Sequence, residues 1–298
     1  MSNPKKQHYV PQVYLKHFTH ESGFLFIYDK ATDEFRKQTP ANTGYSKHFY
    51  TVEKNGEKDY TIEKLLAAHV DTLYQPVIKK IERKEILTRE DKVNLAIFLS
   101  FQHLRTPAQR KNYHHMVDEF YKKTSKIIFQ MKKVHGQLEN YNEHEIEMLE
   151  DIFENEKYDV EVPKEQSLEL MLKFSEEMST MLSNHNFVIL EASSKSVFIT
   201  SDDPYCMVKE KWSEPWSGYG IINTTKLFPL TPRHLLVLKD PGEKMFYMQM
   251  DKSQVREINF TIALWSDRFV YSSNEILLKS LVAKIKKKVE ERNQKRTD

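Results

Sequence analysis

His8 has the side chain best suited to chemistry at neutral pH. It lies between Gln7 and Tyr9, and Pro11 follows three residues later. An imidazole can act as a general base, bind a metal ion or anchor a hydrogen bond. Pro11 restricts Val10 to extended backbone, so the histidine has stiff surroundings. His8 is therefore a candidate general base, and equally a candidate for structural hydrogen bonds between the N-terminus and a sheet.

Gln102 and Arg105 form a second candidate pair. They lie three residues apart on an expected helix, just before Thr106 and Pro107, and therefore share one helix face. An arginine at a buried helix end can hold a phosphate or a carboxylate through two parallel hydrogen bonds. Arg105 is thus either a catalytic group that neutralises a phosphate or a structural partner of acidic residues elsewhere.

Asp202 and Asp203 follow a strand-like run at 197–200 and precede Pro204. Paired carboxylates at a strand end suit a divalent cation such as Mg²⁺ or Mn²⁺. In the alternative interpretation, the aspartate side chains accept hydrogen bonds from backbone amides in a turn. We expect Arg105 to contact one of these two carboxylates in either case.

Together these five residues favour metal-assisted phosphodiester hydrolysis on nucleic acid or a nucleotide. In this hypothesis His8 activates water, Asp202 and Asp203 hold the metal, Arg105 neutralises the phosphate and Gln102 lies beside it. The alternative is a non-catalytic binding or sensing protein in which the same residues form a structural polar network. A terminal basic helix, with Lys284–Lys288, Lys295 and Arg296, could then contact phosphates, although such charge runs are commonly solvated.

Two other reactions have weaker support in the sequence. The order His8, Asn42, His48 is similar to that of His-Asn-His nucleases, but the segment at 42–44 is also an ordinary turn sequence. ADP-ribosyl transfer would use His8 with nearby tyrosines, and no catalytic glutamate is identifiable for it.

Five segments carry a resemblance to a known family. They are Lys6–Phe18 (KQHYVPQVYLKHF), Phe49–Thr51, Gln102–Pro107, Thr200–Pro204 and Phe228–Pro232. The chain resembles the mostly bacterial domain-of-unknown-function family DUF4238, and the matches span almost its whole length. The resemblance implies an intracellular bacterial protein of unassigned activity. It supplies no catalytic residues.

Both helices and strands are predicted to position the candidate residues. The sequence predicts a hairpin at 24–38, helices from Thr61 through 135, further helices near 142–164 and 168–182, and strands near 187–190, 197–200, 235–238, 245–248 and 268–271. Helices are expected at 254–265 and 274–293 as well. This order favours an α+β fold in which central helices pack with a mixed or antiparallel sheet built from N- and C-terminal segments. We expect one interlocked domain over residues 1–298, with a weak boundary possible within 136–164.

Composition narrows the class of protein. Among 298 residues the net charge is only +2, so no bulk electrostatic attraction favours a nucleic acid or an anionic membrane. A single cysteine, Cys206, excludes an internal disulfide and cysteine-ligated metal clusters, and fits a reducing cytosol. There is no signal peptide, no stretch long enough to span a membrane and no nucleotide-loop or zincin motif. We therefore expect a cytoplasmic protein without a membrane partner.

Overall fold

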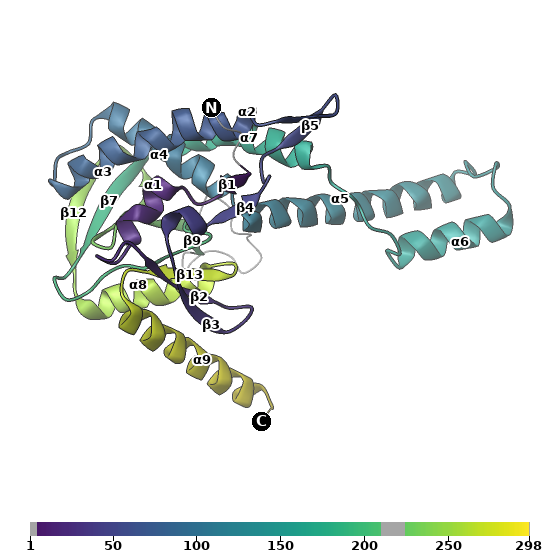
Figure 1. Cartoon of the computed structure of the whole chain (residues 1–298). Helices are drawn as coiled ribbons and strands as arrows, with labels where there is room; N and C mark the ends of the chain where they lie inside the picture. The colour runs from purple at the N-terminus through teal and green to yellow at the C-terminus, as the bar shows by residue number, and fades with distance from the viewer. Residues whose placement is uncertain (1–4, 210–223, 298) are drawn as a thin grey trace. The chain divides into compact units, whose positions relative to one another are not determined.

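The structure is a computed structural model that describes residues 5–209 and 224–297 (Figure 1). Its backbone contacts divide the chain into two compact units, one of Met1–Thr106 with Leu172–Asp298 and the other of Pro107–Met171. The segment 136–164, where the sequence allows a boundary, lies within the second unit. Whether the whole chain unfolds as one domain stays a prediction. The architecture is α+β, as expected from the sequence.

A four-stranded antiparallel sheet joins the two ends of the chain. Its order is β3-β2-β13-β8. The strands are β2 (Leu25–Asp29), β3 (Glu34–Gln38), β8 (Thr200–Ser201) and β13 (Phe269–Ser272). The N-terminal hairpin β2-β3 therefore pairs with C-terminal strands, as the sequence pattern predicts. The buried residues Phe26 and Tyr28 of β2 belong to the same core cluster as Val270 of β13.

A second sheet has five strands, all from the C-terminal half, in the order β12-β7-β11-β10-β9. The strands are β7 (His185–Ala192), β9 (Cys206–Lys209), β10 (Thr224–Pro229), β11 (His234–Pro241) and β12 (Met245–Met250). Strands β12 and β7 are parallel and the other pairs are antiparallel. The sequence pattern indicates one sheet, whereas the described strands form two large sheets, because β8 and β13 pair with the N-terminal hairpin while the other C-terminal strands pair among themselves.

Two small ribbons complete the β-structure. They are β1 (Lys6–His8) with β4 (Tyr45–Lys47), and β5 (Val52–Lys54) with β6 (Glu57–Asp59). The β1-β4 ribbon brings Val10 against Gly44, where the Val10 amide donates to the Gly44 carbonyl at 3.0 Å. Gly44 has φ +66°, and a Cβ there would lie 2.8 Å from the Val10 Cβ. Only glycine permits this close approach, which holds the N-terminal segment in place.

The helices follow the expected pattern except in one region. They are α1 (Gln12–Leu15), η1 (Lys16–Phe18), η2 (Pro40–Asn42), α2 (Thr61–Leu65), η3 (Leu66–Val70), η4 (Asp71–Leu73), α3 (Tyr74–Glu82), α4 (Arg89–Leu104), α5 (Pro107–Val134), α6 (Glu143–Glu154), α7 (Lys164–Ser183), α8 (Lys252–Trp265) and α9 (Glu275–Thr297). Helix α4 begins with a capping box, in which Thr88 accepts from the Asp91 amide and Asp91 accepts from the Thr88 amide. This is the start that the sequence predicts.

The helical stretch at 61–82 differs from the prediction. Pro76 is expected to interrupt the helix, but it lies in the first turn of α3, where its missing amide hydrogen would have had no helical partner. The break comes earlier: η3 is a π-helical turn and η4 a 3-10 turn. Such turns change the direction of the side chains that follow, and π-turns are frequent at functional sites.

Helices α8 and α9 lie at the C-terminal end of the first unit. In Figure 1, α9 runs below β2 and β3, and it contacts β2, β13 and α8. The buried side chains Val255 and Ile262 of α8 and Leu278 and Leu281 of α9 enter the core cluster. These two amphipathic helices therefore cover the four-stranded sheet.

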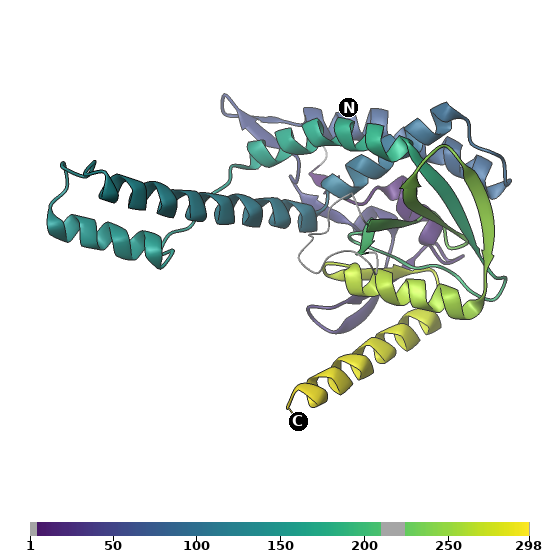
Figure 2. The ribbon, with the colours of Figure 1, turned by 180° about the vertical axis from the view of Figure 1, so that it is seen from behind.

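The second unit contains α5 and α6, which pack antiparallel in Figure 2. Phe129 and Phe153 contact each other with ring centroids 5.1 Å apart, and Lys133 pairs with Glu150 at 2.6 Å. Gly136, with φ +61°, lies just after α5, where the sequence predicts the end of the helix. Among the described helices of both units, none is long and apolar enough to cross a membrane.

Asp29 anchors the hairpin to the C-terminal strand. Its carboxylate, only 1% exposed, accepts two hydrogen bonds from Arg268 at 2.8 and 2.9 Å and one from Arg36 at 3.1 Å. These hydrogen bonds hold the pKa of Asp29 well below its usual range, despite burial. An ion pair of this kind resists separation because each partner left alone is a desolvated charge.

We expect Asp29→Asn to lower the free energy of unfolding by about 1–3 kcal/mol, since it leaves Arg268 without a carboxylate. Asp33→Asn, on the same hairpin but exposed, is the control and should have a smaller effect. Because the folded pKa of Asp29 is lowered, its contribution is present at neutral pH and is lost as the pH falls through that pKa. Urea unfolding at pH 7 and pH 3 measures this; equal effects of both variants would contradict the assignment.

Candidate functional site

Among the side chains that the structure describes, Arg105 is the largest that is fully buried, with 1% exposure. It caps the C-terminal end of α4. Its Nη1 donates to Asp71 Oδ1 at 2.9 Å, and its Nε and Nη2 donate to Gln102 Oε1 at 3.3 and 3.1 Å. The expected partner, Asp202 or Asp203, is therefore replaced by Asp71 of η4. The π-turn before Asp71 brings this carboxylate to the buried guanidinium.

Gln102 positions the N-terminal segment. Its Nε2 donates to the backbone carbonyl of Tyr9 at 3.1 Å, while its Oε1 accepts from Arg105. The amide is thereby satisfied on both sides, as buried polar groups usually are. Gln102 therefore links α4 to the residue next to His8.

His8 retains an unpartnered atom. Its Nε2 is buried and makes no hydrogen bond within the described part of the chain. Burial lowers the pKa of the imidazole, the backbone of Ala41 and the carboxylate of Asp71 raise it, and Arg105 lowers it further. The net shift is downward, so His8 is neutral at pH 7 and can accept a proton.

Glu63 is a residue that the sequence analysis missed. It lies on α2, is partly buried, and its pKa is raised to about 7 by burial, with Asp71 raising it further and Arg105 opposing. His8 and Glu63 thus both lie within the electrostatic reach of Asp71 and Arg105. The helical spacing at 61–73 predicts a helix that includes Glu63. It does not show which acidic side chains lie on the same face, because the π-turn decides that.

His103 and Tyr205 form a second unpartnered pair. Their rings lie 4.6 Å apart, and neither the His103 Nδ1 nor the Tyr205 hydroxyl has a hydrogen-bond partner in the described residues. Burial lowers the pKa of His103 to about 4, so the ring is neutral. Because Tyr205 follows the Asp202–Pro204 segment, this contact brings that segment to α4. The three expected segments do meet, although through atoms other than those predicted.

Asp202 has a structural role in the strand end. Its carboxylate accepts from the backbone amides of Asp267, Arg268 and Phe269 at 3.1, 2.8 and 2.9 Å. Burial raises its pKa to about 6, against the effect of these amides. The alternative interpretation expected amides of a local turn before Pro204, whereas these amides belong to Asp267–Phe269, far along the chain. This arrangement explains why Arg105 pairs with Asp71, since Asp202 is already satisfied at the start of β13.

A metal centre is not assembled from the described side chains. Among residues 5–209 and 224–297, no three histidine, cysteine, aspartate or glutamate side chains come together as a possible ligand set. Asp203 donates its backbone amide to Ser201 Oγ at 3.2 Å. In the His-Asn-His order, Asn42 accepts from Lys6 Nζ at 2.6 Å, and His48 lies 3.5 Å from Thr51 Oγ1. The role of Mg²⁺ or Mn²⁺ at Asp202 and Asp203 stays a prediction.

Comparison with known proteins agrees with the motifs. A family model described as "Protein of unknown function (DUF4238)" matches residues 6–275. The chain belongs to this family. No curated protein and no solved structure matches the chain.

The family segments of this DUF4238 chain meet in the core. Tyr14 of the first segment donates to the Pro229 carbonyl at 2.8 Å, and Thr200 Oγ1 lies 2.5 Å from its hydroxyl. Tyr74 donates to the Leu230 carbonyl. Thus residues from the segments that begin at Lys6, Thr200 and Phe228 share one hydrogen-bonded centre.

A double-mutant cycle tests the new partner of Arg105. We expect Asp71→Asn and Arg105→Gln to be non-additive in the free energy of unfolding by more than about 0.5 kcal/mol, because they share one ion pair. Asp202→Asn with Arg105→Gln is the control and should be additive within that margin. Chemical denaturation of the three single and two double variants measures both terms. Coupling of Arg105 to Asp202 alone would contradict the observed pairing.

Proposed function

We propose that this DUF4238 protein is a phosphodiesterase that cleaves nucleic acid or a nucleotide by acid–base catalysis at His8 and Glu63. The observation that carries the proposal is a set of buried polar atoms without partners among the described residues: His8 Nε2 and His103 Nδ1 in the family segments, and the Tyr205 hydroxyl directly after one of them. Buried polar groups are normally satisfied, so unsatisfied atoms indicate that a ligand supplies the partners.

The protonation states support an acid and a base. Between the lowered pKa of His8 and about 7, the imidazole is neutral and Glu63 is protonated. His8 then removes a proton from the attacking hydroxyl or water, and Glu63 donates one to the leaving oxygen. Arg105 acts as a positioning residue, since its guanidinium lies buried between Asp71 and Gln102 and sets the field around both groups.

The location of the protein is part of the same proposal. Cys206 is a free and buried thiol, which fits a reducing, intracellular compartment. A nucleotide or nucleic acid would be available there as substrate.

Non-catalytic binding is the second candidate function. It is favoured because the motif glutamines already have hydrogen-bond partners within the protein. Gln7 donates to Thr51 Oγ1 at 2.8 Å and accepts from the Tyr50 amide at 2.6 Å, and Gln102 is equally satisfied. These bonds are structural. In this case the unpartnered atoms would bind a ligand without changing it.

Activity of matched variants separates the two candidates. We expect His8→Gln and Glu63→Gln to lower the cleavage rate of fluorescent RNA and DNA oligonucleotides, or of bis(p-nitrophenyl) phosphate, at least 100-fold. The melting temperature should change by less than a few degrees. Exposed His20→Gln and Glu57→Gln are the controls and should keep full activity. The assay is run in EDTA and in Mg²⁺ or Mn²⁺.

Each outcome of this assay has one meaning. Cleavage in EDTA that only the two site variants lose supports the acid–base proposal. Cleavage that EDTA abolishes and Mn²⁺ restores favours the metal-assisted reaction expected from the sequence. No turnover by the native protein, with lower melting temperatures for both site variants, leaves binding as the function.

The pH dependence should report the same two groups. We expect a bell-shaped rate profile whose acidic limb follows His8, below pH 6.5, and whose alkaline limb lies near pH 7, where Glu63 loses its proton. Glu63→Gln should remove the alkaline limb from any residual activity. A profile that rises through pH 8 without a limb near 7 would exclude Glu63 as the acid.

A further inference from the structure

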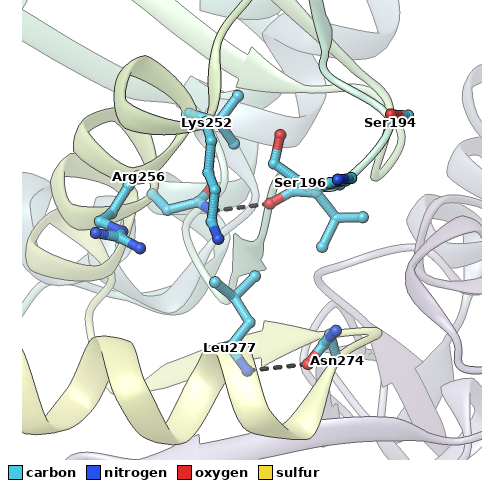
Figure 3. Close-up of a pocket in the computed structure, with 10 residues that line it drawn as sticks. Ser194, Ser196, Lys252, Arg256, Asn274 and Leu277 are labelled. Atoms are coloured by element: carbon cyan, nitrogen blue, oxygen red, sulfur yellow. Dashed lines mark hydrogen bonds between the residues drawn. The ribbon is translucent and has the colours of Figure 1, made fainter.

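A basic groove lies between α8, the start of α9 and the turn at 193–197, and neither His8 nor Glu63 lines it. Two adjoining cavities of about 260 and 380 Å³ share Lys252, Arg256, Asn259, Asn274 and Leu277. Figure 3 shows Lys252 extending from α8 toward Leu277 of α9, with Ser196 on the neighbouring turn. The volumes fall within the range of small-molecule pockets, or just below it.

The groove is lined by cations and contains no acidic side chain. Its cations are Lys195, Lys252, Arg256 and Lys284. In the part of the chain that the structure describes, none of the four forms an ion pair. Other lysines of α9 are paired: Lys279 binds Glu275 at 2.9 Å, and Lys286 binds Asp33 at 2.5 Å. The groove therefore has uncompensated positive charge in a protein that is nearly neutral overall.

The wall of the groove is rigidly built. Asn259, buried on α8, accepts from the Ile199 amide at 3.0 Å and donates to the Val197 carbonyl at 2.8 Å. Arg233 donates to the carbonyls of Ser193 and Ser196 at 2.5 and 3.1 Å. These bonds hold the 193–197 turn against α8, so the cations surround a shaped cavity and not a flat surface.

The charge arrangement favours phosphate. Lys252 and Arg256 lie four residues apart and share one face of α8. Asp251, next to Lys252 in the sequence, is engaged, since it caps α8 by accepting from the amides of Ser253 and Gln254. Val255 and Leu277 supply an apolar floor on which a base or sugar can pack.

The lysine run of α9 extends the same positive surface. Lys284 and Lys288 both lie over the ring of Phe260 on α8, at 5.8 and 4.4 Å from its centroid. The contact turns these two lysines toward α8, whereas Lys286 and Lys287 pair with Asp33 and Glu291. Part of the lysine run is therefore paired with acidic residues, and part, with Lys284, faces the groove. The side chains of Lys295 and Arg296 lie outside the described part.

We propose that this groove binds the phosphate groups of a nucleotide or of single-stranded nucleic acid. The guanidinium of Arg256 and the ammonium groups of Lys195, Lys252 and Lys284 bind the phosphate oxygens, and the apolar floor receives the nucleoside. The site is separate from His8 and Glu63, and binding here does not require cleavage.

Binding measurements on the full chain test the proposal. The probes are a fluorescein-labelled ten-nucleotide single strand and a fluorescent ATP analogue, with inorganic phosphate as competitor. We expect Lys252→Gln/Arg256→Gln to weaken binding at least 10-fold, and to reduce the slope of log K against log salt for the single strand by about 1.4. Lys54→Gln/Lys58→Gln, on the exposed β5-β6 ribbon, removes the same charge and should change binding less than twofold.

Comparison of the two probes identifies which phosphate-bearing ligand the groove binds. Tighter binding of the single strand than of the ATP analogue assigns the groove to nucleic acid, and the reverse assigns it to a nucleotide. Exposed His20→Gln should bind both probes like the native protein. Binding is measured without turnover, so a failure of catalysis at His8 leaves this result unaffected. The proposal is overturned if neither probe binds below 1 mM at low salt, if both double variants bind equally, or if anionic vesicles bind but neither probe does.

Discussion

The hydroxyl of Tyr14 connects the parts of the core. A buried phenol must find hydrogen-bond partners, and this one donates to Pro229 of β10 and lies beside Thr200 of β8. The first strand belongs to the five-stranded sheet and the second to the four-stranded sheet. Helix α1 is thereby attached to both sheets at once. Together with the Val10–Gly44 contact and the Gln102–Tyr9 hydrogen bond, this attachment holds the N-terminal segment that carries His8.

Arg105 imposes a second constraint, because a desolvated cation requires a carboxylate. Asp71 satisfies it, and the π-turn that brings Asp71 inward also places Glu63 near the same guanidinium. Burial raises the pKa of Glu63, Arg105 opposes the rise and Asp71 adds to it. The partly buried position of Glu63 therefore generates the acid that the proposed reaction uses, and the Asp71–Arg105 ion pair adjusts it.

Much of the secondary structure follows from local chemistry. The capping box of Thr88 and Asp91, the hairpin β2-β3 and the end of α5 before Gly136 are all predictable, because they depend on neighbouring residues. The π-turn and the first-turn position of Pro76 are not, since packing of Leu66 and Val70 into the core decides them. Strands β1, β9 and β10 escape prediction for the same reason, as their pairing partners lie far along the chain.

The candidate site likewise has some features that the sequence predicts and others that only the tertiary structure decides. From the sequence alone one obtains the α+β class, the family and the segments that hold His8, Gln102, Arg105 and Asp202. The partner of each side chain was decided by tertiary structure: Asp202 meets three amides of β13 and its preceding turn, and Arg105 meets Asp71. The physical reason is competition. A buried charge pairs with whichever opposite group the fold brings within hydrogen-bond distance, and sequence spacing does not encode that distance across 34 residues.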